Sequence, residues 1–360
     1  MSDLFKSIER VWAGMKQGQA PLPEIAAVAP ERCWPPGSAG TRIGRDEMYF
    51  TVRINEMHLG ANRQWYTVHD PMVLVVTEFN YGQQRLTIPS VVGPNLIRTQ
   101  MAGDKPKYGV VLLDTRVAGP HPYRGGDVDV SVGFYCVQRE NYAQTLMSVV
   151  EKLSGALGSL GHLDMIAKTG SALLEGVDGL LGLNGTTMLA GHRISLATSP
   201  FDPFVTGFYG MIAPPVPSDV SSLQVRERRL YVGSDAGGAG AAPYRDSDFV
   251  LLGISGSDTR GDEDSLPFHA LKSEALDALR DGEEGLRRGK ANLITAYQQM
   301  RKSSDMTTTG AHRMFEKWLE DFEQERVRIE KVQALSTLPE KSTADELTND
   351  LNAAVKRIGY

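Results

Sequence analysis

The sequence predicts an α+β protein with a mostly antiparallel, β-sandwich-like core, a Gly/Leu-rich helical insertion and a C-terminal helical hairpin. Three observations predict this class. Short runs that alternate between apolar and polar residues lie between 42 and 137 and return after 192, and a period of two is typical of half-buried strands. Residues 141–190 change to helical spacing. After 266 the chain is strongly charged, and its apolar residues recur at intervals of three and four.

The N-terminal segments are expected to lie outside the core. Residues 1–17 place apolar side chains at helical spacing, which predicts a short amphipathic helix. Residues 18–40 contain Pro21, Pro23, Pro30, Pro35 and Pro36. Proline neither continues a helix nor fits a central strand, so we interpret this segment as an extended linker.

The β-rich core is expected over residues 41–258. Met48, Phe50, Val52 and Ile54 share one face of the first strand. Further strands are expected at 72–79, 84–88, 108–113, 127–137, 192–197, 207–213 and 247–254, and a hairpin is expected at 223–232. Turn residues separate the early ones, for example Gly119-Pro120. Because no helices lie between these early strands, the sheet should be antiparallel rather than a doubly wound nucleotide-binding fold.

The insertion at 141–190 is the most unusual part of the sequence. Glycine recurs through it at 155, 158, 161, 170, 176, 179, 182 and 185. Glycine costs about 1 kcal/mol relative to alanine within a helix, so broken or closely packed helices are expected. They either cover the sheet or, through residues 153–183, make a conditional membrane contact. A second glycine-rich stretch, 233–242, is expected to be a flexible loop.

The C-terminal residues are expected to form a helical module at 259–338 and a helical tail at 339–360. Within the module, residues 282–302 predict one helix. A second, strongly amphipathic helix carries an apolar stripe with Phe315, Trp318, Leu319 and Phe322. These four are the candidate interaction residues, because such a stripe must pack against something.

No motif of high specificity for catalysis, a cofactor or a metal is found, so no catalytic, cofactor-binding or metal-binding residue is predicted. Gly253-Ile254-Ser255-Gly256-Ser257 approaches a nucleophile elbow, but its fifth residue is serine and a polar stretch follows. The histidines lack metal-binding spacing. Asp127 and Asp129 could ligate calcium, but a solvated strand face explains them more simply.

Composition and charge narrow the compartment and the partners. The chain has 360 residues, a net charge of -6 and two cysteines, Cys33 and Cys136. The acidic balance argues against nucleic acid as the partner, and the two thiols predict a reducing, cytoplasmic location. The N-terminus lacks the pattern of a signal peptide. No stretch approaches the roughly 20 apolar residues that span a bilayer, so a soluble protein is expected.

Three functional hypotheses remain open. The leading one is a non-enzymatic scaffold or effector that binds another protein through its helical module. The alternative is an effector that perturbs membranes after cleavage or rearrangement exposes the Gly/Leu-rich segment. A weaker one is a hydrolase with a non-standard site around His69, His121 and Asp127.

Overall fold

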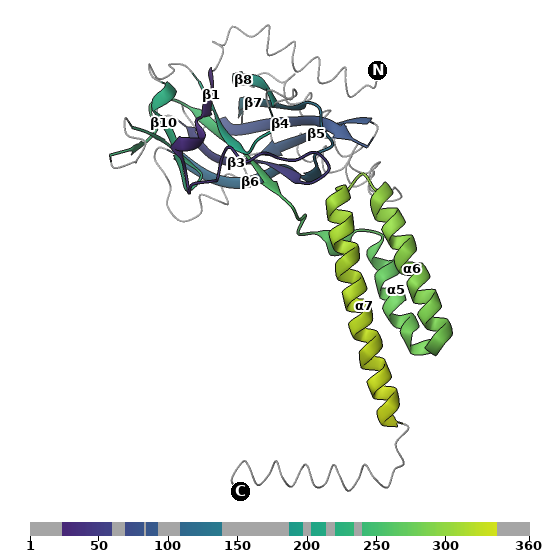
Figure 1. The fold of residues 1–360 in the computed structure, drawn as a ribbon. Coiled ribbons are helices and arrows are strands. Elements are labelled where there is room, and N and C mark those ends of the chain that lie inside the picture. Colours follow the sequence, from purple (N-terminus) through teal and green to yellow (C-terminus); the bar gives the residue numbers. More distant parts are fainter. Residues whose placement is uncertain are drawn as a thin grey trace, which may run out of the picture. The chain divides into compact units, whose positions relative to one another are not determined.

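The computed structural model describes residues 24–59, 69–82, 84–92, 109–138, 187–196, 203–213, 220–233 and 240–336. The chain divides into two compact units, Met1–Arg260 and Gly261–Tyr360. The first unit contains the strands and the second contains the long helices (Figure 1). This content confirms the predicted α+β class. In the described residues the strands form three sheets, in which all pairs are antiparallel except β2 with β10.

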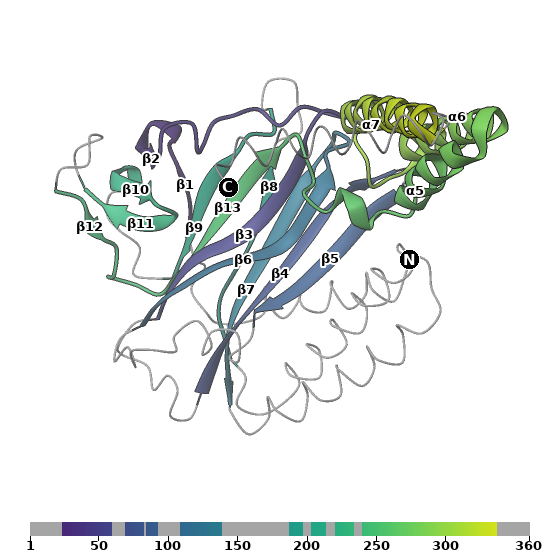
Figure 2. The same ribbon diagram turned by 90° about the horizontal axis from the view of Figure 1, so that it is seen from below.

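A five-stranded sheet lies at the centre of the first unit (Figure 2). Its order is β1 (Glu24–Val28), β9 (Gly207–Ile212), β13 (Phe249–Ser257), β3 (Tyr49–Leu59) and β6 (Gly109–Pro122). Phe50, Val52 and Ile54 of β3 are buried on one face, as the alternation predicts. The register with β13 then shifts by one residue, because Leu252 pairs with Ile54 and Leu251 pairs with Glu56. This bulge places both Asn55 and Glu56 on the opposite face.

The second sheet packs against the buried face of β3. Its order is β5 (Gln84–Val92), β4 (His69–Tyr81), β7 (Val128–Gln138) and β8 (Thr187–Leu196). Val128, Val130, Val132 and Phe134 of β7 are buried. They belong to one hydrophobic core with Phe50, Val52 and Ile54 of the central sheet.

A third, smaller sheet covers part of the other face of the central sheet. Its order is β12 (Ala242–Pro243), β11 (Arg229–Val232), β10 (Leu223–Arg226) and β2 (Cys33–Trp34). Leu223, Val225 and Leu230 of this sheet form a second core with Phe249 and Leu251 of β13. The central sheet is therefore apolar on both faces over this half of β13, which explains the continuous apolar run of the strand.

The structure corrects three expectations from the sequence. The linker predicted at 18–40 contains β1 and β2, because its prolines leave residues 24–28 free to pair as an edge strand. Gly119-Pro120, expected in a turn, lies within β6 where the register with β3 shifts. The insertion predicted at 141–190 ends earlier, because residues from Thr187 onward pair with β7. Its other residues lie outside the described part of the chain, as do 1–17 and 339–360.

The second unit contains α5 (His269–Ala278), α6 (Gly282–Lys302) and α7 (Thr308–Ser336). α6 has the bounds expected from the sequence, and α7 contains the predicted amphipathic helix. The three helices share one hydrophobic core, which includes Ala275 of α5, Leu293 of α6 and Trp318 of α7. Burial of one apolar stripe from each helix stabilises the unit.

Two glycines of α6 allow the close approach of α5. A Cβ atom at Gly285 would lie 1.9 Å from the carbonyl oxygen of Ala278, and one at Gly289 would lie 2.8 Å from that of Ala275. Backbone atoms cannot move aside as a flexible side chain can. The glycines therefore set the distance between the helices, although glycine is unfavourable within a helix.

We expect Gly285→Ala to destabilise the helical unit. Alanine gains about 1 kcal/mol of helix propensity, but the backbone clash should cost more and leave a net loss of about 1–3 kcal/mol. Thermal unfolding followed by far-ultraviolet circular dichroism measures the change. Lys290→Ala, at an exposed position of α6, is the control and should change stability by less than about 0.5 kcal/mol. A Gly285→Ala variant as stable as the wild type would contradict the proposed role of this glycine.

Candidate functional site

A pocket of about 420 Å³ lies in the first unit, on the face of the central sheet that the small sheet only partly covers. Phe249 and Leu251 of β13 lie beneath the small sheet. The next residues on that face, Gly253 and Ser255, line the pocket instead. A volume of several hundred cubic ångströms is usual for a small-ligand site, so this pocket is the candidate functional site.

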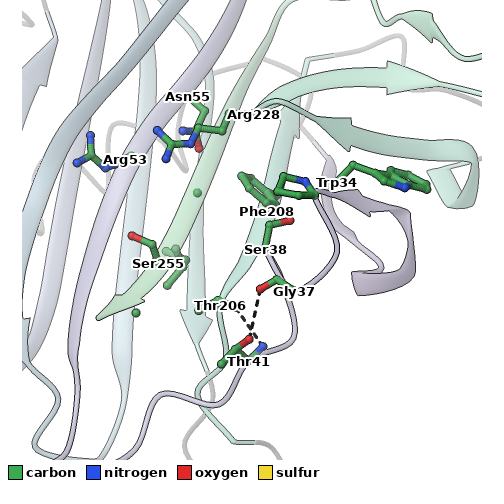
Figure 3. A pocket seen from close by; sticks show the side chains of 14 residues that line it. Trp34, Gly37, Ser38, Thr41, Arg53, Asn55, Thr206, Phe208, Arg228 and Ser255 are labelled. Carbon is green, nitrogen blue, oxygen red and sulfur yellow. Dashed lines mark hydrogen bonds between the residues drawn. The ribbon is translucent and has the colours of Figure 1, made fainter. Parts of the chain in front are cut away.

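One end of the pocket is cationic. Arg53 of β3 and Arg228 of the β10–β11 turn both contact Asp114 of β6, and Arg53 and Arg228 line the pocket (Figure 3). Nη1 of Arg53 donates to the Asp114 carbonyl oxygen at 3.0 Å, and Nη1 of Arg228 donates to Oδ2. Nδ2 of Asn55 donates to Oδ1 at 3.0 Å. Two guanidinium groups and one carboxylate leave this end with a formal charge of about +1.

The glycine at 253 makes room for Asn55. A Cβ atom at this position would lie 2.1 Å from Oδ1 of Asn55, so a larger residue would displace the amide. Asn55 is only 3% exposed, and its Oδ1 has no hydrogen-bond partner in the described part of the chain. Buried polar atoms are usually paired, so this oxygen needs a partner that the described residues do not supply.

The opposite wall is the loop that follows β2. Thr206, which precedes β9, holds this loop through three hydrogen bonds. Its backbone NH donates to the carbonyl oxygen of Thr41 at 2.8 Å, its carbonyl accepts from the NH of Gly40 at 2.8 Å, and its hydroxyl accepts from the NH of Thr41 at 3.1 Å. Ser38 lines the same wall, and its Oγ has no partner among the described residues. The wall is therefore anchored at one end and offers a second unpaired oxygen.

Aromatic rings complete the pocket. Phe208 of β9 lines it and is 8% exposed. Trp34 of β2 also lines it, and the guanidinium carbon of Arg226 lies 4.8 Å from the centre of its ring. The neighbouring Cys33 is buried, and burial raises the pKa of its thiol to about 11. Because the thiolate is the reactive form, Cys33 is not a nucleophile at neutral pH. The pocket can thus bind an anionic group, hydrogen-bond donors and an apolar group together.

The four interaction residues predicted from the sequence do not form one exposed surface. Trp318 and Phe322 are 3% and 2% exposed and belong to the core of the helical unit. Phe315 is half-buried, and its ring stacks on that of Tyr297 with 4.4 Å between the ring centres. Leu319, 41% exposed, is the most accessible of the four. Binding of another protein at this helix stays a prediction.

The structure does not bring His69, His121 and Asp127 together. The ring of His121 stacks on Phe79 near the end of β4, with 4.6 Å between the ring centres. His69 begins the same strand, ten residues earlier. Because a strand rises about 3.3 Å per residue, the two histidines lie on the order of 30 Å apart. This separation counts against a shared hydrolytic site.

The two aspartates considered for calcium also differ in environment. Asp127 is exposed, whereas Asp129 is 4% exposed and contacts Arg85 and Ser195. An arginine beside a carboxylate already neutralises it, so this pair is not prepared for a cation. Within the described ranges, no group of three or more His, Cys, Asp or Glu side chains is placed to hold a metal ion.

Ser255, the serine of the elbow-like motif, lines the pocket but does not stand in a nucleophile elbow. Gly253 to Ser257 lie within β13 and not in a sharp turn, so the motif does not hold Ser255 as an elbow would. Sequence reasoning missed Trp34, Arg53, Asn55, Phe208 and Arg228. The hairpin expected at 223–232 is confirmed by the antiparallel pairing of β10 with β11. Its two-residue turn holds Glu227 and Arg228 at φ of 47° and 63°, where asparagine and glycine are usual, so the sequence did not mark Arg228 as a turn residue.

The regions behind the membrane and cleavage hypotheses are mostly beyond the described residues. Residues 153–183 lie entirely outside them, and of the loop at 233–242 only the ends are described, where β11 pairs with β12. Conditional membrane contact and cleavage therefore stay predictions. Among the helices that the structure describes, none combines the length and the apolar character needed to cross a bilayer.

Comparison with protein-family models, with curated proteins and with solved structures found no match to this chain.

Proposed function

We propose that the chain is a non-enzymatic interaction protein and that its recognition site is the pocket of the first unit. The observation that carries this proposal is the pair Arg53 and Arg228, which Asp114 and the fold hold in place at the wall of a 420 Å³ pocket. Side chains that are already ordered lose little entropy when a ligand binds, which favours recognition.

The chemistry of the lining supports binding rather than turnover. Arginine stays protonated at all physiological pH values, so it binds and orients an anion but does not exchange protons. Ser38, Thr206 and Ser255 supply hydroxyl groups, and Phe208 and Trp34 supply apolar surface. A catalytic serine would need a base within hydrogen-bond reach, and the described residues that line the pocket include no His, Asp or Glu.

The proposal includes the finer architecture expected from the sequence. A β-sandwich-like arrangement of the central and second sheets is supported by the core that their side chains share. A helical hairpin of α6 and α7 is supported by the stacking of Tyr297 on Phe315. In this arrangement the sandwich is the rigid support of the pocket, and the helical unit is a separate module.

Ligand-induced thermal stabilisation of the intact chain tests the proposal. The probes are a set of small metabolites and short peptides, compared on the wild type and on Ser255→Trp, which places an indole in the pocket from an exposed strand position. A probe that stabilises the wild type but not Ser255→Trp supports the proposal if it is recovered chemically unchanged. The control is Thr309→Trp, which adds the same side chain to an exposed position of α7.

Two outcomes would overturn the proposal. The first is that every stabilising probe acts equally on the wild type and on Ser255→Trp, because binding would then lie elsewhere. The second is turnover of a probe that a single polar substitution in the pocket abolishes, because the chain would then be an enzyme.

A further inference from the structure

The shape and the unpaired atoms of the pocket point to the class of its ligand. We propose that the pocket binds the carboxyl-terminal residues of an extended peptide and that Arg53 and Arg228 hold the terminal carboxylate. This inference rests on the proposed function, since it names the ligand of the same site. Two arginines at one end of a pocket favour a carboxylate, because the planar guanidinium group donates two parallel hydrogen bonds to it.

The cationic end is already ordered in the free protein. Asp114 contacts both arginines from one side and accepts a hydrogen bond from Nδ2 of Asn55 at 3.0 Å. The side chains of Arg53 and Arg228 remain 34% and 57% exposed. Each guanidinium group contacts Asp114 through Nη1. The N–H groups on its other two nitrogens can donate to a second carboxylate.

Two buried oxygen atoms of pocket-lining residues lack a hydrogen-bond partner within the described ranges. Oδ1 of Asn55 and Oγ of Ser38, in opposite walls, have no partner in the described residues. A ligand that satisfies both must carry donors as well as a carboxylate. The backbone NH groups of a peptide supply such donors beside the terminal carboxylate, and small adjustments of the two side chains would expose the buried oxygens to them.

The floor matches an extended chain of a few residues. Residues 253–256 of β13 line the pocket, and three steps along a strand cover about 10 Å, the length of roughly three extended residues. On the pocket face of β13, the amide of Asn55 occupies the space beside Gly253, and Ser255 carries a small side chain. A peptide backbone can therefore approach the sheet at Ser255. Phe208 offers an apolar wall for a peptide side chain.

The test uses two pools of N-acetylated pentapeptides with all positions randomised, one ending in a free carboxylate and the other in an amide. Each pool is passed over the immobilised full-length chain, and retained peptides are identified by mass spectrometry and titrated. We expect the wild type to retain the acid pool at least about tenfold better than the amide pool, because the terminal charge pairs with both arginines. Binding should weaken as salt rises.

Substitutions assign the binding to the two arginines. Arg53→Ala and Arg228→Ala should each weaken retained acid peptides by about tenfold or more. Arg53→Lys should also weaken them, because lysine keeps the charge without the paired donors. Arg45→Ala removes an arginine whose side chain is 73% exposed and outside the pocket lining, and it should leave binding unchanged. Thermal unfolding verifies that each variant is folded.

The outcomes separate this inference from the proposed function. Equal retention of acid and amide peptides, lost in Ser255→Trp, would overturn the terminal carboxylate but leave the pocket as the recognition site. If amidated peptides are retained and all of them contain Asp or Glu, the arginines bind a side-chain carboxylate and the inference is overturned. Both proposals would be overturned if acid peptides bind Ser255→Trp as well as they bind the wild type. They would also be overturned if the wild type retains neither peptide pool and no metabolite or peptide stabilises the wild type more than Ser255→Trp.

Discussion

Glu56→Ala is expected to destabilise the β-rich unit by about 3–5 kcal/mol, because it breaks a buried charge pair and leaves its partners unsatisfied. Glu56 is 0% exposed and lies in the bulge of β3. Its Oε2 accepts from the backbone NH of Leu230 at 2.6 Å, and its Oε1 pairs with Nη2 of Arg245 at 3.0 Å. One carboxylate therefore joins the central sheet to the small sheet that borders the pocket.

Chemical denaturation of the full chain, followed by far-ultraviolet circular dichroism, measures this loss. Glu47→Ala, at an exposed position of the same unit, is the control and should change stability by less than about 0.5 kcal/mol. Glu56→Gln keeps the shape and one acceptor, so its loss should be smaller than that of Glu56→Ala. Equal stability of Glu56→Ala and the control would show that the Glu56 carboxylate does not stabilise the β-rich unit.

The same carboxylate should give the stability a defined pH dependence. Burial, the largest influence, raises the pKa of Glu56 above its ordinary 4.5, although Leu230 and Arg245 act in the opposite direction. The folded state therefore binds its proton more tightly than the unfolded state. The stabilisation that comes from this tighter proton binding is fully present below about pH 4.5 and is lost as the pH rises through the raised pKa. As the pH rises over this range, the wild type should lose stability relative to Glu56→Gln. A stability difference that does not change with pH would contradict the expectation.

Comparison with Glu56→Gln is needed because His58 has the opposite effect on the pH dependence of stability. Burial lowers the pKa of His58 below its ordinary 6.5, and its Nδ1 lies 2.9 Å from the carbonyl oxygen of Ser247. A histidine kept neutral in the folded state stabilises it at high pH, and this contribution is lost as the pH falls from about 6.5 through the lowered pKa. The two groups partly offset each other in the wild type, whereas the Gln variant isolates Glu56.

Local periodicity explains why much of the fold could be predicted. The buried face of β3 and that of β7 follow from a period of two, and the bounds of α6 follow from a period of 3.6 together with the charged residues around it. Both signals lie within a single element. Edge strands such as β1 were missed, because five residues between prolines carry too little periodicity to distinguish a strand from a linker.

The pocket could not be predicted, because its residues come from distant parts of the chain. Arg53 is separated from Asp114 by 61 positions, and Arg228 is separated from Asp114 by 114. A charged residue at any of these positions is usually interpreted as a solvated surface residue. The pairing of β3 with β6 and the turn between β10 and β11 bring the three together. The hairpin is local, but the pairing of β3 with β6 and the position of the turn beside Asp114 are not encoded in a local pattern.

Phe322→Ala is expected to destabilise the helical unit by about 3–5 kcal/mol, as large-to-small substitutions of buried aromatic residues do. The Phe322 side chain is 2% exposed, and its ring lies over Gly289 of α6, where a Cβ atom would be 2.8 Å from Cε2. Removal of the ring leaves a cavity that the closely packed helices cannot fill. Urea denaturation followed by circular dichroism measures the loss for the full chain.

Leu319→Ala is the matched comparison, because it removes an apolar side chain from the same helix at a position that is 41% exposed. Its effect on stability should stay near 0.5 kcal/mol, the usual limit for surface positions. A loss as large as that of Phe322→Ala would mean that Leu319 is covered in the protein in solution. The expected contrast instead separates two positions of one amphipathic stripe: Phe322 holds the helices together, whereas Leu319 is an exposed apolar residue of α7.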